Sequence, residues 1–245
     1  MIHLYTEETL PTFTESWQDT YIRSRFLAYG SKERFAPFFC DEKGRMLSLL
    51  DGNGVLNGIS TENTAEWAAF FSMNPYITKL TADISIATEL ARILQKPMIL
   101  KKIMRLETPL SKPDILLTEP SPRQMYPLLS TAFGEDMPAF DGWYVDVSHR
   151  IRHGICQTAG VERDGKLVST AMTVALSEKA IIIGSVATAA THRKQGLASQ
   201  CLKKLAAQNS EKVVMISPKN DSAEKLYTSL GFSVVDTLGE IILKG

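Results

Sequence analysis

Three basic residues, His192, Arg193 and Lys194, lie together where an apolar, strand-like run gives way to a helical one. The N-terminus of a helix already carries about half a positive charge, so acidic residues are favoured in its first turn. This sequence has no acidic residue there before Glu211, which forgoes roughly 0.3 to 1 kcal/mol of dipole stabilisation. The pattern indicates that an anion binds where the helix begins.

Gly196 suggests which anion this is. A glycine in the first turns of a helix costs roughly 1 kcal/mol relative to alanine, but its missing Cβ lets a ligand approach the backbone. A strand, a tight turn and then Arg-x-x-Gly-x-Ala would direct several unbonded backbone N–H groups at one point. The chain has no GxxxxGK[ST] or GxGxxG motif, so the usual patterns for nucleoside triphosphates and dinucleotides are absent. A pyrophosphate group is the best remaining guest.

The elements that position this turn form one continuous α/β unit from Ser121 onward. Ser121 and Pro122 suit the start of a helix, and Asp164-Gly165 predicts an antiparallel hairpin. Asp221 and Glu224 have the spacing of a capping box. The expected elements are helices at 121–134 and around 143–154, a hairpin around 163–166, a buried strand at 180–187, the helix of the anion site, a strand at 212–217 ending before Pro218, a helix ending at Gly231, and a last strand that closes the sheet.

At these residues the chain resembles the GNAT family of acetyl-coenzyme A-dependent N-acetyltransferases. The family signature is a strand ending in V-A-x followed by [RQ]-x-x-G-x-[GA], and the matching residues are Val186, Ala187, Thr188, Arg193, Gly196 and Ala198. The resemblance covers roughly residues 113–245 and implies an α/β fold with a mixed central sheet flanked by helices. It also implies acetyl-CoA as acyl donor. The backbone of 186–188 would pair with the pantetheine arm, and the N–H groups of 194–199 would hold the pyrophosphate. The cofactor-binding residues expected from it are Val186, Ala187, Thr188, Arg193, Lys194, Gln195, Gly196, Leu197, Ala198, Ser199 and Asn220.

The resemblance further implies that an acceptor amine attacks the thioester and that a tyrosine protonates the departing thiolate. Tyr227 stands where that acid is expected. Many members carry a glutamate on the signature strand as general base, but here the neighbourhood is Ile183, Gly184 and Ser185. The loop between the first two helices holds three candidate bases, which could equally orient a cationic amine: Glu135, Asp136 and Asp141.

Several of these residues have a simpler interpretation. Arg193 and Lys194 could be an ordinary solvated helix start, although this leaves Gly196 unexplained, and Tyr227 could be a core aromatic. His149 and His153 have a metal-binding spacing but no evident third ligand, so we expect surface histidines and no metal site. Cys201 falls on the apolar stripe of its helix and is expected to be inert.

Residues 1–110 show a similar order of strand-like and helical runs, less clearly marked, and are expected to be a degenerate copy of this fold. Strand-like runs surround residues 41–44, and a further strand, two helices and two more strands follow. The segment matching the signature turn, STENTAEW, has acidic residues in place of basic ones and no glycine, so it should repel a pyrophosphate. Tandem arrangements of this kind occur in the family, mycothiol synthase being one. The linker would lie near 108–114, with a cofactor-binding domain at 113–245. A plain two-layer α/β interaction domain is the alternative for the first half.

Composition restricts where the protein acts and what it binds. Lys plus Arg equals Asp plus Glu, 27 each, so no global field attracts nucleic acid or an anionic membrane. The three cysteines, without CxxC spacing, favour reduced thiols in a soluble cytoplasmic protein. Two functions stay open: transfer of acetyl to an amine of a small molecule or peptide, or a non-catalytic acyl-CoA-binding or protein-interaction module. The acceptor's identity and the oligomeric state do not follow from the sequence.

Overall fold

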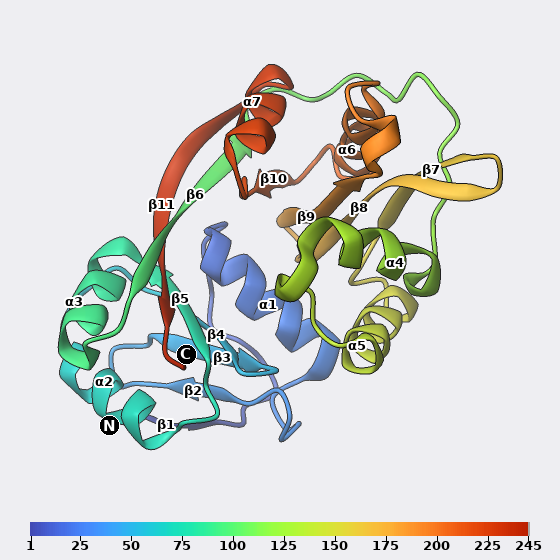
Figure 1. The fold of residues 1–245 in the computed structure, drawn as a ribbon. Helices are drawn as coiled ribbons and strands as arrows, with labels where there is room; N and C mark the ends of the chain where they lie inside the picture. Colours follow the sequence, from blue (N-terminus) through green and yellow to red (C-terminus); the bar gives the residue numbers. More distant parts are fainter. Residues whose placement is uncertain (245) are drawn as a thin grey trace. The chain divides into compact units, whose positions relative to one another are not determined.

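The computed structural model describes residues 1–244, and these divide into two compact units. The first unit comprises residues 1–103 and the described residues from Val234 onward, and the second comprises residues 104–233. Strands β6 (Met98–Leu106) and β11 (Phe232–Ile242) lie beside each other, and each contributes residues to both units (Figure 1). The boundaries of the compact units therefore lie within β6 and β11, whereas the sequence predicted a single boundary at 110–113.

The second unit is a mixed sheet with helices on both faces. Antiparallel strands β7, β8 and β9 are followed by β10, which pairs with β9 in parallel, and Met215 and Ile216 of β10 pair with Arg105 and Met104 of β6. Its elements are α4 (Pro122–Phe133), η1 (Gly134–Asp136), α5 (Phe140–Arg152), β7 (Thr158–Arg163), β8 (Lys166–Leu176), β9 (Ala180–Thr188), η2 (Ala190–His192), α6 (Leu197–Ala207), β10 (Val213–Ile216) and α7 (Asp221–Ser229).

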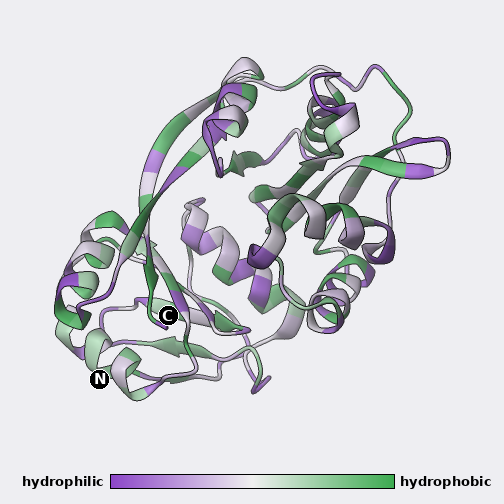
Figure 2. Cartoon of the chain, in the orientation of Figure 1, coloured by the Kyte–Doolittle hydropathy of each residue, from purple (hydrophilic) through white to green (hydrophobic). Residues whose placement is uncertain are grey.

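Adjacent residues of β8 show how the sheet is covered. Ala171 belongs to an apolar cluster with Cys201 and Leu205 of α6, whereas its neighbour Met172 packs with Met125 of α4 and with α5. Successive side chains of a strand point to opposite faces, so α6 covers one face and α4 and α5 the other. Strand β10 and the first residues of β9 are accordingly apolar (Figure 2), as expected for a sheet buried on both sides.

The first unit repeats this pairing pattern. Strands β2, β3 and β4 are antiparallel, β4 pairs with β5 in parallel, and β5 pairs antiparallel with β11 at residues 238–242. Its elements are β1 (His3–Tyr5), α1 (Trp17–Tyr29), β2 (Phe38–Cys40), β3 (Met46–Leu50), β4 (Asn53–Leu56), α2 (Thr64–Met73), β5 (Lys79–Asp83) and α3 (Ile84–Leu94). The same order of strands and crossover helix occurs twice, as expected for a repeated fold.

The final strands are exchanged between the two copies. In chain order β6 follows α3, yet its last residues pair with β10 of the second unit. In the same way β11 follows α7, yet its residues from Val234 onward belong to the first unit, where Leu238–Ile242 pair with β5. The expectation that residues 232–245 close the sheet of the C-terminal half is therefore wrong for most of this strand. Its buried residues Leu238 and Ile241 fill the sheet of the first unit instead.

Helix α1 was not expected from the sequence. Ser16 caps it by accepting from the backbone N–H of Asp19 at 3.1 Å, and the Asp19 carboxylate accepts from Asn57 Nδ2 at 2.8 Å. Many of its buried residues are polar, among them Gln18, Asp19 and Thr20, so no apolar periodicity marks the helix. Across residues 1–244, no helix is both long and apolar enough to cross a membrane.

Candidate functional site

A cleft of about 620 Å³ opens in the second unit where β9 and β10 part. The parallel pairing of the two strands ends at Ile183 and Ile216, two residues before Pro218. The lining residues come from the end of α4, from β9 beyond its pairing, from the turn into α6, and from the connection into α7. They are Ala132, Phe133, Gly184, Ser185, Val186, Ala187, Thr188, His192, Arg193, Lys194, Gly196, Leu197, Ala198, Ser199, Ser217, Lys219, Asn220, Ser222, Ala223, Leu226 and Tyr227.

The wall formed by β9 contains a β-bulge. Thr170 pairs with Ala187 and Met172 pairs with Gly184, so Ser185 and Val186 together oppose the single residue Ala171. Ser185 has φ of +49°, a left-handed conformation that non-glycine residues adopt rarely. A bulge interrupts the ladder and redirects the backbone. Backbone groups of this strand therefore face the cleft, where an extended ligand arm could pair with them.

The turn into α6 lies at the other wall. The basic residues precede the helix and do not form its first turn: η2 ends at His192, Arg193 is extended, and Lys194 is left-handed with φ of +61°. The helix begins at Leu197, later than expected, and Gly196 is its N-cap with φ of +73°. Glycine suits this position because it carries no steric penalty there, so it does not weaken the helix as the sequence suggested.

Gly196 leaves the start of α6 open to a ligand. A Cβ built on it would meet nothing within 4 Å, so the space beside the backbone belongs to the cleft. The first N–H bonded within the helix is that of Gln200, to the Gly196 carbonyl at 3.2 Å, and no side chain of the described residues caps the earlier ones. The N–H groups of residues 197–199 and the positive helix end therefore suit an anion.

All but one of the expected cofactor-binding residues line this cleft. The exception is Gln195, which lies in the turn but outside the lining set. Asn220 lines the cleft and is also the N-cap of α7, where its side chain accepts from the Ala223 backbone N–H at 2.9 Å. The cap expected at Asp221 is therefore wrong, because Asn220 already has the extended backbone of a cap and Asp221 is the first helical residue. Lining residues missed by the sequence reasoning include Phe133 and Lys219, which carry no signature motif.

Tyr227 lies on α7 with its ring in the core. The residue is 5% exposed, its ring centre lies 6.1 Å from that of Phe232, and it also lines the cleft. No hydrogen bond of its hydroxyl is present among residues 1–244. Burial raises the pKa of Tyr227 to about 12, so the phenol stays protonated at neutral pH. The arrangement provides a phenol that lines the cleft and makes no hydrogen bond within the described residues, and the ring also packs in the core.

The position expected for a basic carboxylate is sterically closed. A Cβ on Gly184 would lie 2.8 Å from Cγ1 of Val174, so no longer side chain fits there without displacing Val174. Of the loop candidates, Asp136 accepts from Lys219 Nζ at 2.6 Å, and Glu135 and Asp141 are exposed. No carboxylate belongs to the residues that line the cleft in the described chain. The structure therefore brings Tyr227 and the anion turn together without an adjacent acidic base.

The sequence of this unit matches a family model. Residues 122–232 match the acetyltransferase (GNAT) family. The matched segment contains every residue that lines the cleft. Residues 122–232 are a GNAT acetyltransferase domain. This places the domain in a family of acyltransferases.

Solved structures share the fold over most of the chain. A tandem GNAT protein from the clavulanic acid biosynthesis pathway is 14% identical, with 92% of each chain covered and a TM-score of 0.61. A GCN5-related N-acetyltransferase-like protein from Streptococcus suis is 15% identical (93% of this chain, 99% of that one, TM-score 0.57), and a GCN5-related N-acetyltransferase from Kribbella flavida is also 15% identical (92% and 97%, TM-score 0.58). These likenesses show the fold. No curated protein matches the sequence significantly.

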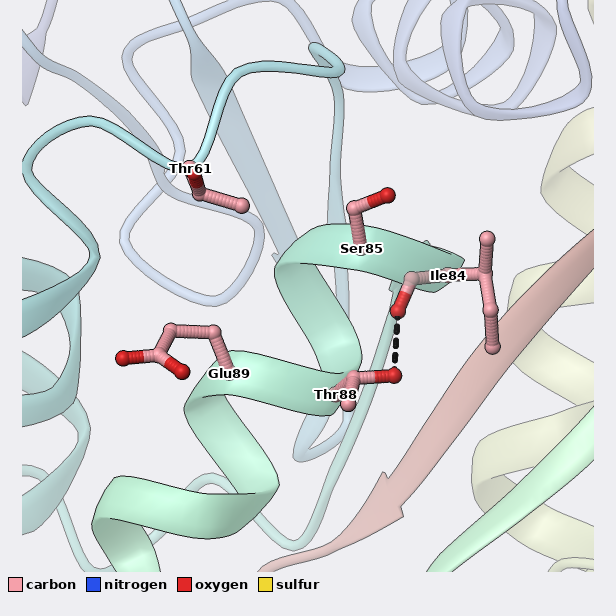
Figure 3. A pocket seen from close by; sticks show the side chains of 5 residues that line it. All are labelled: Thr61, Ile84, Ser85, Thr88 and Glu89. Carbon is pink, nitrogen blue, oxygen red and sulfur yellow. Dashed lines mark hydrogen bonds between the residues drawn. The ribbon is translucent and has the colours of Figure 1, made fainter.

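The first unit has a smaller hollow of about 440 Å³ between the segment before α2 and the first turns of α3 (Figure 3). In chain order this place corresponds to the cleft of the GNAT domain. Its lining residues are Thr61, Ile84, Ser85, Thr88 and Glu89, and the Thr88 hydroxyl donates to the Ile84 carbonyl at 2.7 Å. Glu89 is bound by Arg92, with Nη2 at 2.7 Å from Oε1. The hollow thus contains a carboxylate and no basic residue among those that line it.

The two crossover helices begin with the same backbone conformation. Asn63, the N-cap of α2, has φ of +59°, close to the +73° of Gly196 at the start of α6. Tyr227 lies seven residues after Asn220, the N-cap of α7. The residue seven positions after Asp83, the N-cap of α3, is Leu90, which is fully buried and carries no hydroxyl. The turn geometry is thus repeated while the chemical groups are replaced. That this unit binds no cofactor stays a prediction.

The remaining candidate residues are occupied by structural contacts. The rings of His149 and His153 stack at 4.1 Å between centres, and His153 Nδ1 lies 2.8 Å from the His149 carbonyl. No cluster able to hold a metal ion occurs within residues 1–244. All three cysteines are free and buried, and burial raises the pKa of Cys201 to about 11. A thiol held neutral in this way is a poor nucleophile.

Proposed function

We propose that the chain transfers an acetyl group from acetyl-CoA to an amine of a small molecule or peptide. The observation that carries this proposal is that one cleft is lined both by the open helix start at Gly196 and by Tyr227, a buried residue whose hydroxyl has no partner among the described residues. An anion-binding backbone next to a phenol that stays protonated fits a reaction with a pyrophosphate-bearing donor and an anionic leaving group.

The residues fit the cofactor in two parts. The N–H groups of 197–199, with Arg193 and Lys194 beside them, would hold the pyrophosphate. The bulged backbone of 185–188 would pair with the pantetheine amides. Acetyl-CoA, when bound, supplies an acetyl group activated as a thioester.

Tyr227 would act on the leaving group. As the acceptor nitrogen forms its bond to the carbonyl carbon, the carbon–sulfur bond breaks and its electron pair stays on sulfur. The Tyr227 hydroxyl would donate its proton to that sulfur and then be reprotonated from solvent. The acceptor nitrogen must lose a proton of its own. With no carboxylate lining the cleft, we infer that this proton passes to water.

A second function, acyl-CoA binding without catalysis, is favoured by one specific observation. Val174 occupies the space beside Gly184 that a basic side chain would need. A domain that retained the anion turn and lost its base would bind the donor and not turn it over.

Release of free thiol from acetyl-CoA distinguishes acetyl transfer from acyl-CoA binding without catalysis. The full chain would be assayed with polyamines, amino acids, aminoglycosides and peptides, alongside calorimetric titration with CoA. Turnover with any of these amines above the no-acceptor rate supports acetyl transfer. CoA binding without acceptor-dependent thiol release across the panel would favour the binding module, and absence of CoA binding would overturn both.

A further inference from the structure

Lys219 makes two contacts at the edge of the cleft. It lies in the connection between β10 and α7, and its Nζ donates to Oδ2 of Asp136 at 2.6 Å. The same Nζ lies 5.2 Å from the centre of the Phe133 ring. Phe133 is the last residue of α4 and lines the cleft, as Lys219 does, and Asp136 lies in the following turn, η1. One ammonium group therefore touches an aromatic face and a carboxylate together.

This pair of groups is a receptor for an alkylammonium ion. An aromatic face attracts cations through its quadrupole, and a carboxylate forms a charge-assisted hydrogen bond with an N–H donor. The present occupant is itself an alkylammonium, the end of the Lys219 side chain. The Lys219 ammonium thus occupies, beside Phe133 and Asp136, the position that an ammonium group of a ligand would take.

The occupant is held loosely. The side chains of Lys219 and Asp136 are 53% and 61% exposed, and exposed ion pairs of this kind bind weakly because water screens them. Exposed cation–aromatic contacts are similarly weak. A ligand that also contacts other parts of the cleft can therefore displace Lys219 without disturbing the fold.

We propose that Phe133 and Asp136 bind an ammonium group of the acceptor, and that Lys219 occupies this site until the acceptor arrives. The inference rests on the proposed acetyl transfer and names its acceptor class. A nitrogen bound as an ammonium has no free electron pair and cannot attack a thioester. The acceptor must therefore carry a second, uncharged nitrogen that reacts, and the simplest molecules with both groups are diamines and polyamines.

The two partners of the ion pair should respond with opposite signs. Lys219→Met removes the internal competitor and keeps an apolar chain beside Phe133, so a diamine should bind about two- to fivefold more tightly. Asp136→Asn removes the attracting charge, so the same diamine should bind about five- to tenfold more weakly. Phe133→Leu should also weaken binding. An ion pair with only a structural role would not produce opposite changes.

The test is calorimetric titration of the full chain with 1,5-diaminopentane in the presence of saturating CoA, which cannot donate an acetyl group. Lys225→Met is the matched control for the lost cation, because Lys225 is exposed on α7 and does not line the cleft. Glu119→Gln is the control for the lost carboxylate, because Glu119 is also an exposed residue that forms an ion pair, with Lys204 Nζ at 3.1 Å, and does not line the cleft. Both controls should bind the diamine as the wild type does. Melting curves establish that each variant is folded.

Tighter binding by Lys219→Met together with weaker binding by Asp136→Asn supports the site. Equal affinities, changes of the same sign, or no binding by either wild type or Lys219→Met would overturn it. The outcome is separable from that of the proposed function. If the diamine binds with the expected pattern but no thiol is released, the ammonium site is supported and acetyl transfer is refuted. If amines are turned over at a rate that Asp136→Asn does not change, acetyl transfer is supported and the ammonium site is refuted.

Discussion

Replacing Tyr227 with phenylalanine separates its two roles. The ring is 5% exposed and packs against Phe232, so phenylalanine keeps this packing. The hydroxyl has no hydrogen-bond partner within residues 1–244, so its removal leaves no buried group unsatisfied. We therefore expect an unchanged melting temperature at neutral pH and nearly unchanged affinity for CoA.

Turnover should fall, because the leaving thiolate would depart without a proton. A thiol with a pKa near 8.5 is a tolerable leaving group even unprotonated, so the acid contributes on the order of 10² to 10³-fold at most. We expect turnover lowered on the order of a hundredfold, about 2.7 kcal/mol of transition-state stabilisation. Single-turnover measurements at saturating donor, where chemistry limits the rate, give this value directly. Equal rates for the variant and the wild type would show that Tyr227 is only a core aromatic.

The same substitution makes a prediction about alkaline stability. The pKa of Tyr227 is raised to about 12 by burial, against about 10 in an unfolded chain. Above pH 10 the unfolded state releases a proton that the folded state retains, so the wild type should lose about 1.4 kcal/mol of stability per pH unit up to about pH 12. Tyr227→Phe lacks this loss. Denaturant titrations at pH 8 and pH 11 measure the difference between the two proteins, and a difference independent of pH would contradict the burial of the phenol.

Three further predictions concern the cofactor turn and the exchanged strands. Gly196→Glu should abolish CoA binding, since the new carboxylate would lie at the phosphate position. Gly196→Asn should retain much of the binding, because asparagine adopts the same left-handed conformation as the N-cap Asn63 of α2. Thermal shifts with CoA would compare them, and equal shifts would remove the role of this turn. Calorimetry of the full chain should give one CoA per chain, and a stoichiometry of two would refute the loss of the site in the first unit. Ile241→Ala should destabilise the first unit by about 2–5 kcal/mol, because this residue is fully buried there; hydrogen exchange localises the effect, and loss of protection confined to residues 104–233 would contradict the exchange of strands.

The sequence was most informative where one residue type carries one physical requirement. The apolar run at 180–187, the glycine at 196 and the basic residues between them predicted a strand, a turn and an anion site, because each depends on local properties of the chain. The structure places ten of the eleven expected cofactor-binding residues around one cleft. The expected hairpin at Asp164-Gly165 is also present, between β7 and β8.

Local patterns were less reliable at element boundaries. Helix α6 begins at Leu197 because Lys194 and Gly196 both have positive φ, which residue types alone do not specify. The N-cap of α7 is Asn220 and not Asp221 as expected, because the path of the backbone after Pro218 makes Asn220 the extended residue before the helix. Helix α1 was missed because its buried face is polar and satisfied by distant partners such as Asn57.

Only the tertiary structure decided which strands pair and which side chains meet. A strand such as β11 satisfies its backbone equally well beside any exposed strand edge, so its sequence specifies a strand and not a partner. The contact of Lys219 with Asp136 likewise joins residues 83 positions apart and has no periodic signal. What the sequence alone determined was the set of basic residues and the glycine in the turn before α6, a matter of local residue type. The exchange of strands, the closure of the Gly184 position by Val174 and the ammonium contact depend on packing between distant segments, which is encoded only by the whole chain.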